Sequence, residues 1–244
     1  MRFSILLLLT GLALSAGSLD ELRTSLQKLQ GTEPVKASLE HSFWRQVTDD
    51  KKPVITQGRL SAHIEANGQG LRMLWNQPTL QQAARELAAQ EQEPDRGTPT
   101  RMALKGVDPL EAAEALNHAE ALLRDLSQAR VLEERSEAWQ GRPAKVLVLK
   151  LTPRLPEAQR KYLKELRVEA KVWVGPDGLP LAFTSSVAYK GSRFFISFEG
   201  QQAQELQFAR VGSRLVVVRA TSEDQQSGFG ASSQTKKTTT LTLL

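Results

Sequence analysis

Cysteine is absent from this 244-residue chain. Its stability therefore cannot depend on disulfide bonds, even in a compartment that permits them. A bacterial lipoprotein needs a cysteine directly after its signal sequence to carry acyl chains, so we expect no lipid anchor of that kind. A chain of this length can instead bury a large hydrophobic core. We predict one domain over residues 19–244, with a helical insertion at about residues 79–128.

Histidine is scarce, and the common catalytic motifs are missing. His41, His63 and His118 are far apart in the sequence and have no partners at metal-ligand spacing. The chain also lacks a Gly-x-Ser-x-Gly elbow, a phosphate-binding loop and a His-Glu-x-x-His motif. We therefore expect no catalytic residues, no metal site, no cofactor and no enzymatic activity. A hydrolase that uses His41 or His63 is the less favoured alternative.

Long apolar runs are missing too, apart from one at the N-terminus. Residues 1–18 contain one cation, Arg2, then an apolar run and a series of small residues. This order is typical of a secretory signal peptide, and the run is shorter than the roughly 20 residues that span a bilayer. We predict a cleaved signal peptide, with the cleavage site at Ser15, Gly17 or Ser18, and a periplasmic protein. A retained membrane anchor is the alternative.

Aromatic residues make up only 6% of the chain, which bears on nucleic-acid binding. Segment 142–171 has nine lysines and arginines against three glutamates, but only Tyr162 and Trp173 lie in or near it. Such a segment offers few rings on which bases can stack, and the predicted export takes the chain outside the cell. We expect no nucleic-acid partner. This segment and the acid-rich segment 108–138 are interpreted as solvated surfaces, with an acidic partner of the basic segment as the alternative.

Much of the sequence alternates between apolar and polar residues, which is typical of β-strands. The alternation begins at Val35, and Asn67-Gly68 is a strong hairpin signal. About eleven strands are predicted, at residues 35–43, 60–66, 71–75, 131–138, 146–151, 167–174, 181–189, 193–199, 204–211, 214–221 and 236–243. A long series of strands curves because strand twist accumulates. We therefore predict an α+β fold in which a curved antiparallel sheet forms an unclosed β-barrel with helices on one face.

Four segments have helical spacing or helix-favouring composition, at residues 19–29, 80–92, 109–126 and 156–166. Ser18, Thr79 and Asp108 are their predicted N-terminal caps where a cap is evident. Glycine-containing turns are predicted at residues 190–192 and 199–200, and a polar loop at residues 225–237. Short connections of this kind favour pairing between strands that follow one another in the sequence.

Several short motifs resemble the periplasmic outer-membrane lipoprotein carrier superfamily of Gram-negative bacteria. They are Leu19-Asp20-Glu21-Leu22 with Leu26, Phe43, Gly58-Arg59-Leu60, Leu71-Arg72-Met73-Leu74-Trp75, and Val172-Trp173-Val174-Gly175-Pro176-Asp177-Gly178-Leu179-Pro180. The resemblance implies an unclosed β-barrel of about eleven strands with a helical lid over a cavity for acyl chains. Its implied function is noncovalent binding of a lipid, or of the acyl chains of a lipoprotein, in transport and outer-membrane biogenesis.

Apolar residues that share strand faces are the candidate lining of such a cavity. They are Leu60, Met73, Trp75, Phe183, Phe194, Ile196 and Phe198. A concave, mostly apolar site suits a lipid, whereas an ordinary core covered by helices would have the same periodicity. The alternative function is a regulatory module that docks onto another envelope protein through an edge strand or the acidic helix.

Overall fold

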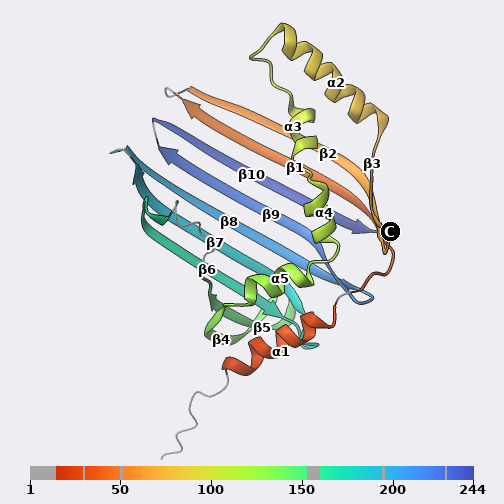
Figure 1. Ribbon diagram of the computed structural model, residues 1–244, viewed down its shortest axis with the longest axis vertical. Helices are drawn as coiled ribbons and strands as arrows, with labels where there is room; N and C mark the ends of the chain where they lie inside the picture. Colours follow the sequence, from red (N-terminus) through yellow and green to blue (C-terminus); the bar gives the residue numbers. More distant parts are fainter. Residues whose placement is uncertain (1–14, 30, 50–51, 153–159, 194–195, 229) are drawn as a thin grey trace, which may run out of the picture.

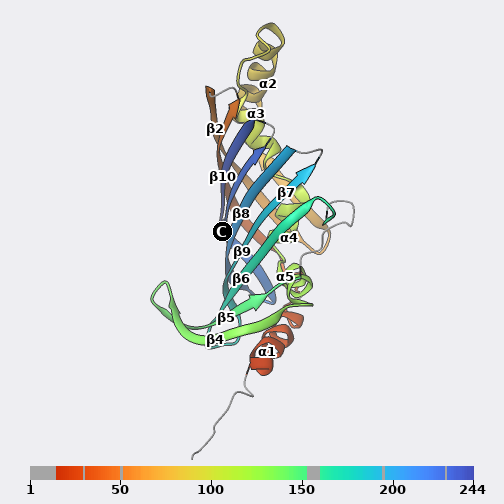
Figure 2. The same ribbon diagram turned by 90° about the vertical axis from the view of Figure 1, so that its left-hand side faces the viewer.

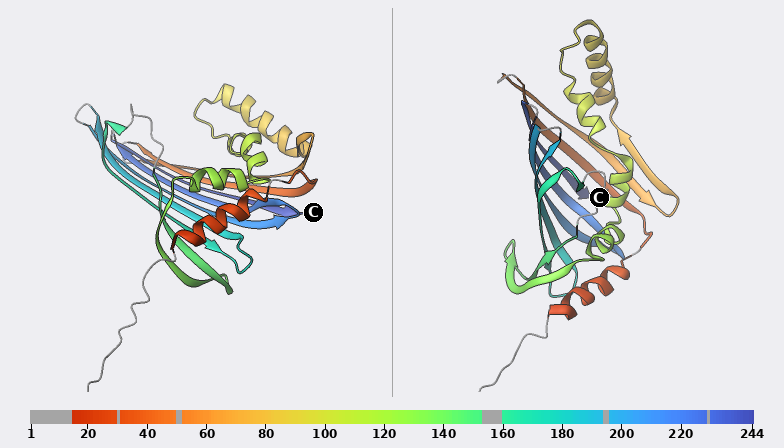
Figure 3. Two further views of the ribbon diagram at one scale, coloured as in Figure 1. Left: turned by 60° about the horizontal axis from the view of Figure 1, so that its bottom comes forward. Right: turned by 60° about the vertical axis from the view of Figure 1, so that its left-hand side comes forward.

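The computed structural model describes residues 15–29, 31–49, 52–152, 160–193, 196–228 and 230–244. In these residues ten antiparallel strands form one curved sheet, and five α-helices lie on one side of it (Figures 1 and 2). Figure 3 shows that the sheet curves without closing. The predicted α+β fold with an unclosed sheet is therefore confirmed. We call the helix-bearing side of the sheet the inner face and the opposite side the outer face.

The strands are longer than the sequence predicted. They are β1 (Val35–Asp49), β2 (Lys52–Asn67), β3 (Gly70–Trp75), β4 (Arg130–Trp139), β5 (Arg142–Lys150), β6 (Leu163–Val174), β7 (Pro180–Arg193), β8 (Ile196–Val211), β9 (Arg214–Gly228) and β10 (Ala231–Leu243). Their order across the sheet is β3-β2-β1-β10-β9-β8-β7-β6-β5-β4. The edge strands β3 and β4 are consecutive in the sequence, so the chain between them must cross the whole sheet.

That crossing is made by helices, which run over the inner face (Figure 1). The helices are α1 (Ser15–Gln27), α2 (Gln77–Gln92), α3 (Pro99–Lys105), α4 (Pro109–Ala115) and α5 (Ala119–Leu126). The sequence predicted one helix over residues 109–126, but it is interrupted between α4 and α5. The N–H group of His118 donates to the carbonyl of Leu215 in β9 at 2.8 Å, so this residue is bonded to the sheet.

Two of the predicted caps are also wrong, and one helix was missed. Asn76, not Thr79, caps α2, since its side chain accepts from the N–H group of Thr79 at 2.8 Å. Ser18 lies inside α1 and donates to Glu134 at 3.0 Å. The missed helix α3 has no side-chain cap of its own, but the Glu86 carboxylate of α2 accepts from the N–H groups at its start.

The structure has ten strands in its described part where eleven were predicted, because two predicted turns lie inside strands. Gly191 lies within β7 and Gly200 within β8. A Cβ atom at Gly191 would overlap the ring of Phe198, and one at Gly200 would overlap the ring of Tyr189. These glycines therefore make room for aromatic rings on the neighbouring strand, which sequence alone does not distinguish from a turn.

Two further predictions are corrected in polar segments. The predicted loop at residues 225–237 forms the ends of β9 and β10, where Gln225 pairs with Gln234 and Lys236 lies 3.2 Å from Glu223. Cross-strand polar pairs stabilise a strand without any apolar alternation, so periodicity missed it. The predicted helix at residues 156–166 lies partly outside the described residues, but Leu163–Leu166 belong to β6.

Two hydrophobic cores fill the space between the helices and the inner face. The α1–α5 core contains Leu22, Leu26, Leu122 and Leu126 from those helices, packed on Leu147 and other residues of β5 to β9. Burying a leucine of this kind contributes about 1.5–3 kcal/mol.

The α3–α4 core packs Ala103 and Leu116 on strands β1, β2, β9 and β10. Helix α3 lies close to the sheet because a glycine stands at each of its two contacts with the strands, Gly58 in β2 and Gly106 at the C-terminal end of the helix itself. A Cβ atom at Gly58 in β2 would be 2.6 Å from the carbonyl oxygen of Pro99, and one at Gly106 would be 2.7 Å from His41 Nε2. No helix in the described residues is long and apolar enough to cross a membrane.

Candidate functional site

The helices cover only part of the inner face, and the candidate site lies on the rest. Strand register places Val47, Ser233, Gln226, Gly200 and Tyr189 in one row across β1, β10, β9, β8 and β7. This row lies six residues beyond His41 along β1, toward the hairpins at the far ends of these strands. We call the part of the inner face around this row the open inner surface.

An apolar cleft of about 350 Å³ lies on the open inner surface. The apolar and aromatic side chains that line it are Val47, Tyr189, Phe198 and Ala231. The rings of Tyr189 and Phe198 are 6.3 Å apart between centroids, with their planes at 57°. Burial raises the pKa of the Tyr189 hydroxyl, and the nearby Asp224 carboxylate raises it further. This hydroxyl is therefore neutral at physiological pH, so the cleft offers two half-buried rings without charge.

A second cleft, of about 430 Å³, lies between α3 and strands β1, β9 and β10. Its charged residues are Arg45, Lys105, Lys237 and Asp224, and Phe43 and Met102 add apolar surface. Among the described residues no carboxylate forms an ion pair with any of these three cations. We call this site the cationic cleft. It shares Gln226 and Ser233 with the apolar cleft, so the two are continuous.

His41 lies at the floor of the cationic cleft and is only 3% exposed. Its Nδ1 atom is 2.9 Å from the hydroxyl of Thr239, whereas the buried Nε2 atom has no hydrogen-bond partner. Burial lowers the pKa of His41, and the charge of Lys237 lowers it further. The imidazole is therefore neutral at pH 7 and contributes hydrogen bonding without charge.

The structure divides the predicted cavity residues into separate groups. Leu60, Met73 and Trp75 pack together in or against the α3–α4 core, and Phe183 belongs to the α1–α5 core. Ile196 and Phe198 lie at the far end of β8, on the open inner surface, where Ile196 is 41% exposed.

Phe194, the remaining predicted residue, lies outside the described part of the chain. Leu60 and Phe183 thus occupy filled cores, whereas Phe198 lines a cleft. A role in ligand contact stays a prediction for every residue of the set.

The sequence contained a signal for part of this site. Alternation continues from Phe43 through Arg45 to Val47, which places the last two residues on the same face as the core. Lys237 lies where the predicted strand at residues 236–243 overlaps the predicted loop at residues 225–237, and Lys105 belongs to the missed helix α3. Periodicity therefore indicated the strands that carry Arg45 and Lys237 but gave no indication that Lys105 lies beside them.

Two larger clefts lie away from the open inner surface. One, of about 550 Å³ on the outer face, is lined by polar side chains that include the cross-strand row Gln46, Gln234, Gln225 and Gln201. The other, of about 670 Å³, lies between α1 and the β4–β5 hairpin. The outer-face cleft also contains the cations Arg167 and Lys190, but each is close to a glutamate, Glu165 at 3.9 Å and Glu199 at 3.5 Å.

Comparisons with known proteins do not assign the chain to a family. No protein-family model matches the sequence. No curated protein matches it significantly.

Two of the solved structures that match the chain align with it over 91% of its length and 90% of their own. One is described as an outer membrane lipoprotein-sorting protein domain from Vibrio parahaemolyticus, with 9% identity and a TM-score of 0.27. The other is a DUF1329 family protein from Desulfovibrio piger, with 8% identity and a TM-score of 0.26. At TM-scores this low, neither similarity establishes a shared family.

Proposed function

We propose that this protein binds a molecule with at least one acyl chain, either a lipid or the lipid part of a lipoprotein, on its open inner surface. It acts by holding its ligand noncovalently, without turnover, in the periplasm. The observation that carries the proposal is the apolar cleft, where Tyr189 and Phe198 present half-buried rings that none of the five described helices covers. Concave surfaces of this composition suit apolar ligands.

The filled cores determine where such a ligand can bind. Leu22, Leu26, Leu116 and Leu122 are at most 1% exposed, so the helix-covered part of the inner face is occupied by the protein's own side chains. An acyl chain that enters there would have to displace helices. On the open inner surface it can bind without such a rearrangement.

The apolar cleft by itself can supply only part of the binding free energy. Each buried methylene contributes about 0.8 kcal/mol, so about ten of them contribute about 8 kcal/mol. Association itself costs about 4–15 kcal/mol in lost freedom. Acyl burial therefore yields modest net affinity, and polar contacts to the rest of the ligand are needed for tight binding.

Displacement of a fluorescent fatty acid tests this function. We expect Phe198→Ala to weaken probe binding about tenfold, because the ring forms part of the apolar cleft. Leu132→Ala is the matched control, since this leucine is 65% exposed on the edge strand β4, far across the sheet. Binding of no acyl probe by the folded wild-type protein would refute the proposal, as would equal effects of the two substitutions.

The second candidate function is a docking module for another envelope protein, and the filled cores favour it. The filled cores leave no space for a ligand beneath the described helices. Apolar residues such as Val54 and Leu80 are exposed outside the cores, where a partner protein could contact them. Native mass spectrometry of protein purified from the periplasm separates the two candidates. A bound mass of lipid size supports the first, and a ligand-free protein that co-purifies with a defined partner supports the second.

A further inference from the structure

We infer that the cationic cleft binds an anionic group, the phosphate or carboxylate head of the same acyl ligand. This inference rests on the proposed function for the acyl chain, which would lie in the adjoining apolar cleft. It assigns Arg45, Lys105 and Lys237 as the residues that recognise the head.

The two faces of the sheet differ in the residues that lie opposite their cations. On the outer face, cross-strand lysines lie opposite glutamates and form ion pairs: Lys36 with Glu65 at 3.2 Å, Lys236 with Glu223 at 3.2 Å, and Lys190 with Glu199 at 3.5 Å. On the inner face, register places Phe43 and Ser222 on the two sides of Lys237.

Arg45 likewise lies between Thr56 and Thr235. Each of these three outer lysines therefore has a carboxylate directly opposite it in the sheet, whereas Arg45 and Lys237 do not.

Positive charge enters the cleft from two sides, the strand pair β1–β10 and helix α3. Arg45 and Lys237 come from neighbouring strands in adjacent rows, and Lys105 comes from the last turn of α3. Asp224 is the one carboxylate that lines the cleft, so the site has two net positive charges. Like charges that share a site repel one another, and an anion between them relieves that repulsion.

Hydrogen-bond donors complete the cleft. The hydroxyls of Thr235 and Ser233 line it, and arginine and lysine are the common partners of phosphate and carboxylate groups. The His41 Nε2 atom at the floor is buried without a partner beside Gly106.

The cationic cleft and the apolar cleft are a short distance apart along β1. Arg45 and Val47 are two residues apart on β1 and face the same side, which corresponds to about 7 Å along the strand. A charged head beside Arg45 would therefore place the start of its acyl chain near Val47 and the ring of Tyr189. The geometry fits an amphipathic anion better than a neutral lipid.

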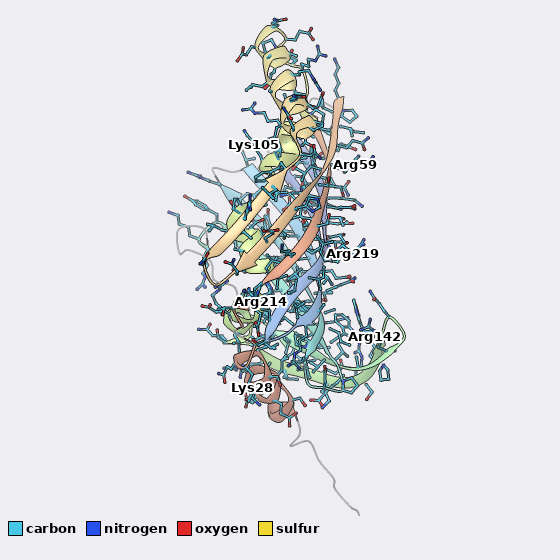
Figure 4. The ribbon with its side chains drawn as sticks, turned by 90° about the vertical axis from the view of Figure 1, so that its right-hand side faces the viewer. Lys28, Arg59, Lys105, Arg142, Arg214 and Arg219 are labelled. Atoms are coloured by element: carbon cyan, nitrogen blue, oxygen red, sulfur yellow. The ribbon has the colours of Figure 1, made fainter. Side chains whose placement is uncertain are left out.

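Calorimetric binding of three probes to matched variants tests the inference. The test variant combines Arg45→Gln, Lys105→Gln and Lys237→Gln. The control variant combines Arg59→Gln, Arg142→Gln and Arg219→Gln, which removes the same charge from three other exposed cations. Figure 4 shows Lys105 on the helix side of the sheet, and Arg59 and Arg219 toward the other side.

The probes are palmitate, hexadecanol and inorganic phosphate. We expect the test variant to bind palmitate at least tenfold more weakly and hexadecanol unchanged, whereas the control variant binds both as the wild type does. A third outcome is that the wild type binds phosphate but neither acyl probe, and that the test variant no longer binds phosphate. That result would show that the cleft binds a free anion, and it would refute the acyl function but not the anion site. If neither palmitate nor phosphate binding depends on these three cations, the inference is wrong.

Discussion

At the scale of single residues, buried ionisable groups couple the fold to pH. Glu86 of α2 is 8% exposed, and its carboxylate accepts from the N–H groups of Thr100 at 2.9 Å and Arg101 at 3.2 Å. It thereby caps α3 from another helix. Burial alone would raise the pKa of Glu86, but the hydrogen bonds from Thr100, Arg101 and Gln82 outweigh it and lower this pKa below its ordinary value.

We expect Glu86→Ala to lower the free energy of unfolding by about 1–2 kcal/mol, as for other lost helix caps. A group with a lowered carboxyl pKa contributes stability above its unfolded pKa and loses it as the pH falls through the folded value. The loss should therefore be full at pH 7 and shrink below about pH 4. Urea unfolding at both pH values measures it, and an equal loss at both would contradict the role of the charged carboxylate.

The buried histidines should act in a different pH range. Burial lowers the pKa of both His41 and His118; the charge of Glu114 partly opposes the shift at His118. Below the unfolded value of about 6.5 the unfolded chain binds protons that the folded chain does not, so stability falls as the pH decreases. We expect the free energy of unfolding to decline between pH 7 and pH 5, and His41→Gln to reduce that slope. An unchanged slope would show that His41 is not the titrating group.

At the scale of elements, the placement of α3 determines the shape of the cationic cleft. Gly58 permits its close approach, because a Cβ atom there would lie 2.6 Å from the backbone oxygen of Pro99 and 2.8 Å from the ring of Phe43. Backbone atoms cannot move aside as a side chain can. At this end of the helix, the distance between helix and sheet therefore depends on Gly58.

We expect Gly58→Ala to destabilise the protein by about 1–3 kcal/mol, the usual effect of overpacking. Gly68→Ala is the control, since no atom lies within 4 Å of a Cβ atom built there. Thermal unfolding of both variants gives the comparison. If Gly58→Ala is as stable as the control, α3 does not contact β2 as closely as described.

The elements also show how far the sequence could predict this fold. Strands with one buried face, such as β1 and the end of β2, follow from alternation alone, and so does the class of an open antiparallel sheet. The start of β10, residues 231–235, could not be found in this way, because Gln234 and Thr235 pair with Gln225 and Asp224 across the sheet and show no apolar alternation. Helix α3 is seven residues long and depends on Glu86 of another helix, so no local pattern indicates it.

The candidate site was predictable only in part for the same reasons. Phe198 was correctly grouped with apolar residues of one strand face, but Gly200 was interpreted as a turn, which hid its packing against Tyr189. Lys105 and Lys237 meet Arg45 only through tertiary structure. A single sequence gives no measure of which apolar faces helices will cover, and that coverage separates the filled cores from the open inner surface.

At the scale of the whole molecule, the two cores are joined into one unit. The α1–α5 core and the α3–α4 core share the partly buried Ala115, and β9 contributes residues to both. We therefore expect Leu26→Ala in one core and Leu116→Ala in the other each to lower stability by about 2–5 kcal/mol. Both should shift the same single unfolding transition in urea. Two separate transitions, each sensitive to one substitution, would show two independent units.

The asymmetry of the sheet is the basis of the functional account. Three cross-strand lysines of its outer face lie in ion pairs, and its inner face is partly filled by helices. The rest of the inner face carries aromatic rings beside three cations that have no ion pair among the described residues. The acyl chain of the proposed ligand fits the apolar cleft, and its anionic head fits the cationic cleft.

Crosslinking with a photoreactive fatty acid, followed by peptide mapping, tests this account most directly. The account predicts adducts on the apolar cleft, at Val47, Tyr189, Phe198 or Ala231, that excess palmitate suppresses. Adducts on the outer face, or none that palmitate competes away, would contradict it.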